Sequence, residues 1–205
     1  MLSQKKFDRI FEHYQKYFGG GCAHFHRLVH GNAVSDIIVV QFEATEAFPY
    51  QTLATIGASE HLVQGEGVQP HRCEFVTFIP SGWSMAEQQH AWILEMLHSV
   101  SMQSMNRRNP LTYGRSLNME EQLRHLQGPD FNMIGATLVL PEAVPDPSIL
   151  HCQTGLTSDI LILQMMPITK DELEWHRTNE NPYCFDRYFY PRHSNEIRFL
   201  CARKR

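Results

Sequence analysis

The sequence has little charge and no long apolar run. Charged residues make up 20% of the 205-residue chain, against about 25% in a typical globular protein. The 22 acidic and 18 basic residues give a net charge of -4 with neutral histidine, which provides no general attraction to nucleic acid or an anionic membrane. No apolar stretch approaches the roughly 18 residues that a membrane-spanning helix requires. We therefore predict a soluble protein with neither a nucleic-acid nor a membrane partner.

The sequence also lacks closely spaced cysteines and a secretory signal. Its cysteines are five in number, an odd count: Cys22, Cys73, Cys152, Cys184 and Cys201. The segment after Met1–Asp8 is amphipathic rather than continuously apolar, unlike a signal peptide. Unpaired thiols are typical of a reducing compartment, so the sequence predicts a cytoplasmic protein.

The short motifs of common enzyme classes are missing as well. There is no Walker phosphate loop, no Gly-x-Gly-x-x-Gly and no His-Glu-x-x-His, and Ile56–Glu60 holds only the first half of Gly-x-Ser-x-Gly. His151 and Cys152 are adjacent, and adjacent residues of a strand point to opposite faces, so they cannot form a catalytic dyad. We predict no catalytic residue and no cofactor. An enzyme with a scattered Cys/His site is the alternative that the sequence leaves open.

Apolar and aromatic residues are abundant enough for a core. Hydrophobic residues make up 42% of the chain, with 12 phenylalanines, 7 tyrosines and 3 tryptophans. This content favours an ordered protein. The length fits one large domain, which we place over residues 1–205.

Apolar periodicity predicts helices and strands in an irregular order. The expected helices cover residues 4–18, 84–102, 119–126 and a short stretch after Thr169, and the expected strands cover residues 37–42, 51–56, 73–79, 132–140 and 160–166. Because helices and strands do not alternate strictly, the order favours an α+β sheet with helices packed on it.

Several local signals refine these elements. Thr169 with Glu172, and Ser84 with Glu87, have the spacing of capping boxes at helix starts. Gly57, at a strand end, predicts a backbone conformation with positive φ. The tryptophans Trp83 and Trp92 are predicted to anchor the core.

Three segments together resemble the suppressor-of-fused (Sufu-type) domain family. They are Gln51–Glu60, with a strand entering a Gly-x-Ser turn and an acidic residue; Arg72–Pro80 followed by Trp83, with a glutamate among apolar residues; and Ile162–Leu173, with a strand whose proline leads into a Thr-x-x-Glu-Leu cap. The segments occur in the family's order, and the resemblance extends over residues 7–177. Residues 178–205 would then form an aromatic C-terminal extension.

The resemblance implies a single mixed sheet and a protein-binding function. Animal members pair this domain with a second one to sequester a transcription factor, and we expect that second domain to be absent here. For a stand-alone bacterial member, the resemblance implies an immunity protein that neutralises a cognate toxin. The resemblance therefore implies a non-catalytic module that binds a protein partner, a toxin in the first instance. A regulatory scaffold with an endogenous partner is the alternative.

One set of residues is a weak candidate metal site. Cys22, His24 and His26 alternate, so on a strand all three would face one side, and thiolate and imidazole are ligands of zinc and copper. The Cys-x-x-Cys or His-x-x-x-His half of common structural zinc sites is missing. We therefore expect no physiological metal.

Partner contacts are predicted in two places. One is the turn Ser59-Glu60-His61, which we expect to be exposed, and the other is the aromatic C-terminal segment around Tyr188 and Tyr190. Packing of these tyrosines against the protein's own sheet is the alternative.

Overall fold

A computed structural model describes residues 2–19, 23–30, 33–65, 67–103, 110–124, 133–155 and 159–179. Its α-helices are α1 (Gln4–Phe18), α2 (Trp92–Gln103), α3 (Glu120–Leu123) and α4 (Lys170–Thr178). Its strands are β1 (Ala23–His30), β2 (Ala33–Phe42), β3 (Tyr50–Ile56), β4 (Val63–Gly65), β5 (Val68–Pro80), β6 (Ser116–Asn118), β7 (Met133–Val139), β8 (His151–Gln153) and β9 (Asp159–Thr169). Short 3-10 helices are η1 (Ala58–Glu60), η2 (Gln88–His90) and η4 (Pro147–Leu150).

The described strands form one mixed sheet. Their order is β1-β2-β3-β5-β9-β7-β6, with β4 paired to β5 and β8 paired to β9. The central strands β5 and β9 run parallel between the pairs Arg72↔Ile160 and Val76↔Gln164. The other paired strands are antiparallel. This topology confirms the predicted α+β class with a single mixed sheet.

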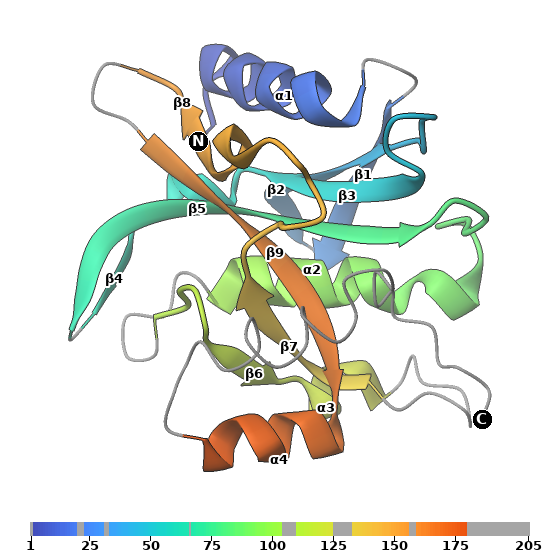
Figure 1. Ribbon diagram of the computed structural model, residues 1–205, viewed down its shortest axis with the longest axis vertical. Helices are drawn as coiled ribbons and strands as arrows, with labels where there is room; N and C mark the ends of the chain where they lie inside the picture. The colour runs from blue at the N-terminus through green and yellow to red at the C-terminus, as the bar shows by residue number, and fades with distance from the viewer. Residues whose placement is uncertain are drawn as a thin grey trace.

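Helices α1 and α2 cover opposite faces of this sheet (Figure 1). The α1 face buries Ile10, Tyr14 and Phe18 of the helix against alternate strand residues, among them Val40, Phe42, Ala54, Val76, Phe78 and Ile162. The α2 face buries Trp92, Ile93, Met96, Leu97 and Val100 against the intervening strand residues, among them Val39, Leu53, Phe75, Ile79 and Leu163. Because both faces are covered, the central strands are apolar on both sides.

Helix α1 confirms the predicted helix over residues 4–18. The side chain of Ser3 accepts a hydrogen bond from the amide of Lys6, which caps the N-terminus. Gly19 follows the last turn at φ 88°, and its amide donates to the carbonyl of Gln15. A glycine with positive φ ends a helix without a steric cost.

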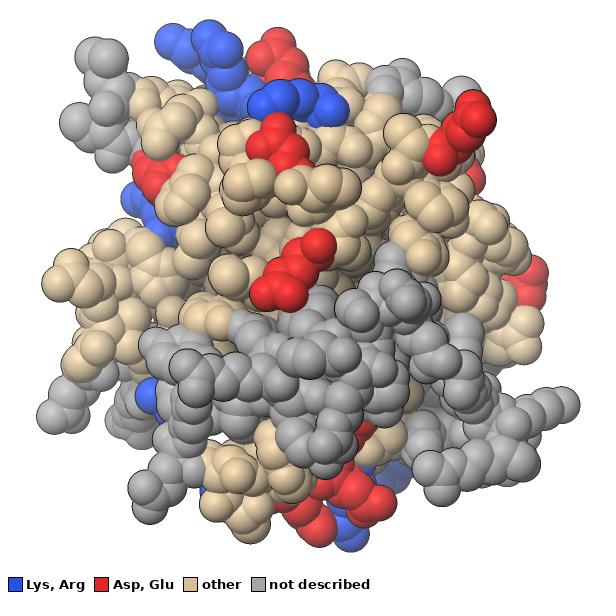
Figure 2. Space-filling model, viewed as in Figure 1, with Lys and Arg blue, Asp and Glu red and all other residues tan. Residues whose placement is uncertain are grey.

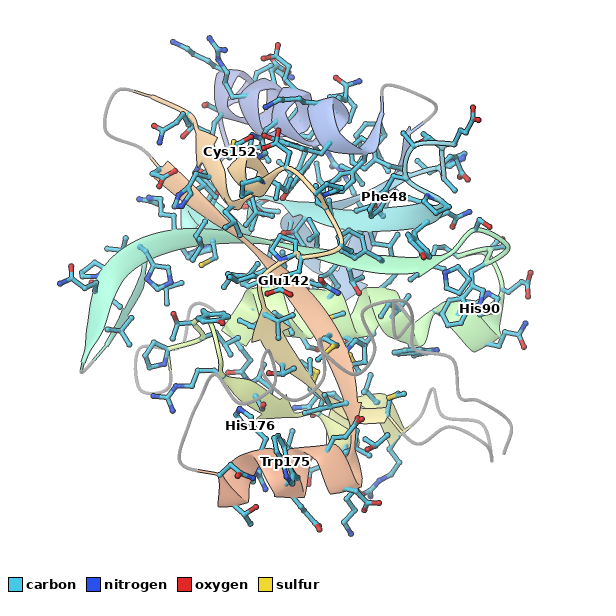
Figure 3. The ribbon with its side chains drawn as sticks, in the orientation of Figure 1. Phe48, His90, Glu142, Cys152, Trp175 and His176 are labelled. Atoms are coloured by element: carbon cyan, nitrogen blue, oxygen red, sulfur yellow. The ribbon has the colours of Figure 1, made fainter. Side chains whose placement is uncertain are left out.

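The predicted start of α2 at Ser84 is wrong. The chain from Ser81 to Ala91 forms turns and η2, and the helix begins at Trp92. The ring of Trp83 stacks on His90, which Figure 3 labels, with centroids 4.3 Å apart. This contact holds the chain between residues 83 and 90 in a loop. The Ser84–Glu87 spacing therefore does not start a helix here. Trp92 is 3% exposed and confirms its predicted place in the core.

Strand β9 is longer than predicted. It continues through Pro167 and reaches Thr169, three residues beyond the expected end at residue 166. Pro167 lies beyond the last pair with β5, Val76↔Gln164, so its missing N–H costs no hydrogen bond on that flank. At Thr169 the predicted capping box is confirmed: the hydroxyl accepts from the amide of Glu172, and the Glu172 carboxylate accepts from the amide of Thr169.

No helix among the described residues is both long enough and apolar enough to cross a membrane.

The edge strand β6 depends on a glycine in β7. A Cβ at Gly135 would lie 2.2 Å from the carbonyl oxygen of Leu117, so Gly135→Ala must push β6 away from the sheet. We expect a loss of about 1–3 kcal/mol in the free energy of unfolding, measured by urea denaturation. The control is Gly82→Ala, because a Cβ there meets no atom within 4 Å. Equal stability of the two variants would contradict the close approach of β6.

Candidate protein-interaction site

The centre of the candidate site is a buried carboxylate, that of Glu74 in β5. The residue is 0% exposed. Its Oε1 accepts hydrogen bonds from the amides of Gly57 (2.9 Å) and Ser59 (3.0 Å). Its Oε2 accepts from the amide of Ala58 (3.3 Å) and the hydroxyl of Thr55 (2.7 Å). The side chain thus satisfies the backbone donors at the start of η1.

The hydroxyl of Thr55 fixes the direction of these hydrogen bonds. Thr55 Oγ1 accepts from the amide of Phe75 at 2.8 Å, so its own proton is directed to Glu74. The four hydrogen bonds of the carboxylate therefore all come from donors, an arrangement that favours its ionised form. Burial raises the pKa of Glu74, while the hydrogen bonds from Thr55, Gly57 and Ser59 act in the opposite direction.

Gly57 confirms the predicted positive φ, at 119°. A Cβ on this residue would lie 2.8 Å from the carbonyl oxygen of Asp36 in β2. The turn after β3 therefore needs glycine both for its backbone conformation and for its approach to β2.

The outer side of the turn is tied to α1 and to β5 by two basic side chains. Arg72 Nη1 donates to the carbonyls of Ser59 (2.6 Å) and Glu60 (2.8 Å). Lys6 Nζ donates to the carbonyl of Ser59 (3.0 Å) and pairs with the carboxylate of Glu60 (2.6 Å). Burial acts to raise the pKa of Glu60, but the hydrogen bond and charge of Lys6 outweigh it and lower the pKa.

The predicted exposure of this turn holds for only part of it. His61 is exposed, and so is the next residue, Leu62, at 40%. Glu60 is half-buried. The prediction is wrong for Ser59, which is 0% exposed because η1 folds back over Glu74. The other predicted contacts, Tyr188 and Tyr190, lie outside the described residues.

The candidate metal ligands His24 and His26 lie on β1, and Cys22 lies outside the described residues. The imidazoles of His24 and His26 lie on the α2 side of the sheet, beside a network of polar side chains. His26 Nε2 lies 2.9 Å from Gln41 Oε1, and His24 Nε2 lies 3.7 Å from Glu43 Oε1. The amide of Gln41 donates to Gln51 at 3.1 Å. Within the described part of the chain, no group of three potential ligands is close enough to hold a metal ion.

Cys152 and His151 point to opposite faces of β8, as predicted. His151 is exposed and lies 2.7 Å from Asp159, whereas Cys152 is 1% exposed and packs beneath α1 (Figure 3). Burial raises the pKa of the Cys152 thiol to about 12. A thiol of this kind is protonated at neutral pH and is a poor nucleophile.

The visible face of the molecule has no large area of one charge. In Figure 2 basic and acidic side chains lie close together near the top and bottom of the view, and only separate acidic side chains appear at its centre and right. In the described part of the chain, the Glu74 carboxylate holds the turn after β3, and the thiols of Cys73 and Cys152 are buried.

The comparisons with known proteins place this fold in a family. The model of the suppressor of fused protein (SUFU) family matches residues 32–189. The chain therefore belongs to the SUFU family. No curated protein matches it in sequence.

Solved structures with a similar fold include the following two. A SUFU homolog from Neisseria gonorrhoeae superposes with a TM-score of 0.63 at 14% identity, over 90% of this chain and 91% of that one. A chain of the Sufu–Fu complex superposes with a TM-score of 0.56 at 13% identity, over 84% of this chain and 79% of that one. At 14% and 13% sequence identity, these similarities show a shared fold and nothing more.

The role of Glu74 predicts a large effect of a small substitution. In Glu74→Gln the amide NH2 must face a pair of donors, so at least one buried N–H or O–H loses its acceptor. We expect a loss of about 1–3 kcal/mol in the free energy of unfolding, measured by denaturant titration. Glu174→Gln, at an exposed position of α4, is the matched control and should change stability little. A Glu74→Gln variant as stable as this control would show that the carboxylate does not hold the turn.

The Lys6–Glu60 pair predicts a pH dependence. The pKa of Glu60 is lowered from 4.5 in the folded protein. A carboxyl group whose pKa is lowered by folding stabilises the fold at pH values above its pKa in the unfolded protein. This contribution is lost as the pH falls through its pKa in the folded protein. The stability difference between the wild type and Lys6→Met should therefore shrink as pH falls below 4.5. Thermal unfolding over that range measures it, and a difference that stays constant or grows would contradict the pair.

Proposed function

We propose that the protein is a non-catalytic binding module of the immunity type, which neutralises a cognate toxin by binding it in the cytoplasm of a bacterium. Membership of the SUFU family carries the proposal. A related fold occurs in the Sufu–Fu complex, where a family member is bound to another protein. Binding through a sheet edge or flank needs no catalytic group.

Within the described residues, the environments of Glu74, Cys73 and Cys152 support a function without catalysis. The Glu74 carboxylate is occupied by four donors. Burial raises the pKa of the Cys73 thiol, as it does that of Cys152. These groups would need the fold to open before they met a substrate.

The exposed side of the η1 turn is the first contact surface that we propose. Glu60 and His61 lie beside Leu62, an apolar side chain 40% exposed, and the Lys6 and Arg72 contacts hold the turn in place. A surface fixed before binding loses little conformational entropy when a partner docks. Tyr188 and Tyr190 remain the second proposed contact region.

The immunity role predicts rescue and direct binding. If a toxin domain is encoded beside this gene, co-expression of the two proteins should restore growth. The two purified proteins should form a complex of fixed stoichiometry in size-exclusion chromatography. His61→Glu with Leu62→Glu should weaken that complex. Lys170→Glu, an exposed change on α4, should not.

Absence of both rescue and binding would remove the immunity role. Binding to an endogenous protein instead of a toxin would identify a regulatory scaffold.

A further inference from the structure

The two ends of the sheet are unequal. At one end β6 has three residues, Ser116–Asn118, and at the other β1 has eight, Ala23–His30. Among the described residues β1 pairs only with β2, so its outer backbone edge has no strand beside it. A long unpaired edge presents a row of amide donors and carbonyl acceptors to which another strand can bind.

The first half of β1 is regular. Its pairs with β2 run without interruption from Ala23↔Phe42 to Arg27↔Ile38, and the register shifts only between Arg27 and Val29. The regular stretch Ala23–Arg27 holds no proline, lysine or acidic residue. It therefore has few of the features by which natural proteins block an edge strand.

An aromatic surface lies beside this edge on the α1 side. Phe25 is 53% exposed, the most exposed of the large hydrophobic side chains described. Its ring lies 5.8 Å from that of Phe11 and 6.3 Å from that of Phe7, centroid to centroid. Phe7 and Phe11 stack on each other at 6.0 Å. We call these three rings the aromatic shelf.

The charged group on the same side of β1 is Arg27. Residues two apart on a strand face the same side, so the exposed Arg27 lies next to Phe25 along the shelf. His24 and His26 face the other side, where they contact Glu43 and Gln41. An incoming strand would thus meet an aromatic side chain and a cation on one side.

We propose that β1 receives an extended segment of the protein partner as an additional antiparallel strand, and that this segment carries an acidic residue two positions before an aromatic one. The inference rests on the proposed binding function and names the chemistry of the bound segment. The aromatic residue lies opposite Phe25 and extends the aromatic shelf. The carboxylate lies opposite Arg27 and pairs with it.

The order of the two residues follows from the direction of the strand. In an antiparallel pair the partner numbering decreases as that of β1 increases, so the residue opposite Arg27 comes two before the residue opposite Phe25. Cross-strand aromatic and opposite-charge pairs each favour binding. A parallel segment would need the reverse order.

Three peptides test the proposal on the full chain. They are Thr-Thr-Glu-Thr-Phe-Thr-Thr, its lysine analogue Thr-Thr-Lys-Thr-Phe-Thr-Thr, and the reversed order Thr-Thr-Phe-Thr-Glu-Thr-Thr. Amide shifts of the isotope-labelled protein are followed to millimolar peptide. We expect shifts at Ala23–Arg27, and tighter binding of the first peptide than of either other by about two- to five-fold.

Charge reversal provides the matched control. Arg27→Glu should make the lysine peptide the tighter ligand, and Phe25→Ser should weaken all three. Lys170→Glu makes the same charge change on α4, at the far end of the sheet, and should leave the preference as in the wild type. Circular dichroism and thermal unfolding show whether each variant keeps the fold.

Several results would overturn the proposal. They are the absence of shifts at β1, equal affinity for the glutamate and lysine peptides, and preference for the reversed order. A concentration-dependent dimer that Phe25→Ser abolishes would assign the edge to a second copy of this chain.

The toxin complex separates this inference from the proposed function. If the wild type binds the toxin and Arg27→Glu binds it equally well, the β1 inference fails and the binding function stands. If the wild type does not bind the toxin, the proposed function fails whatever the peptides show.

Discussion

The hydrogen bonds to the Glu74 carboxylate are the constraint on which the centre of the sheet depends. β5 pairs with β3 from Ala54↔Val76 onward and with β9 up to Val76↔Gln164, so its neighbours change at one residue. On the N-terminal side of Val76, β3 and β5 are no longer paired. The amides of Phe75 and of residues 57–59 therefore bond to side chains instead of backbone carbonyls. Glu74 and the hydroxyl of Thr55 replace the missing acceptors. These side chains satisfy the buried donors that follow the end of β3 and the amide of Phe75 in β5.

The buried side of the turn determines its exposed side. Once the amides of residues 57–59 are held from within, the carbonyls of Ser59 and Glu60 point to Arg72 and Lys6. Lys6 belongs to α1, so the helix on one face of the sheet is linked to the loop that follows β3. The outer residues of the turn are thereby held by α1 and β5 before any partner docks.

Local sequence patterns predicted the elements whose cause is local. The apolar stripe of α1, the β-branched runs of the central strands and the Thr169 capping box each depend on neighbours within a few residues. The short strands β4, β6 and β8 have three residues each, too few for a recognisable alternation. The start of α2 was misplaced because the Trp83–His90 stack, rather than the Ser84 cap, decides the path of the chain.

The site was less predictable because its contacts are distant in sequence. Glu74 bonds residues 15 to 19 positions away. One signal was available: a glutamate within an apolar strand needs buried donors. No local pattern showed that the Ser59 amide supplies one, so Ser59 was placed at the surface. The alternation of His24 and His26 correctly predicted a shared face, but not that Gln41 and Glu43 would be their neighbours.

The two ends of the sheet differ in how completely their apolar side chains are buried. At the β6 end, α4 packs against the strand, and Ser116 lies 3.0 Å from His176 of that helix. Gly135 lets β6 sit tightly on β7. At the β1 end, α1 reaches the strand with Phe7 and Phe11, yet half of Phe25 remains exposed. One more strand beside β1 would cover the Phe25 ring and also pair the outer backbone edge of β1. A single bound segment would therefore bury both exposed features of this end of the sheet.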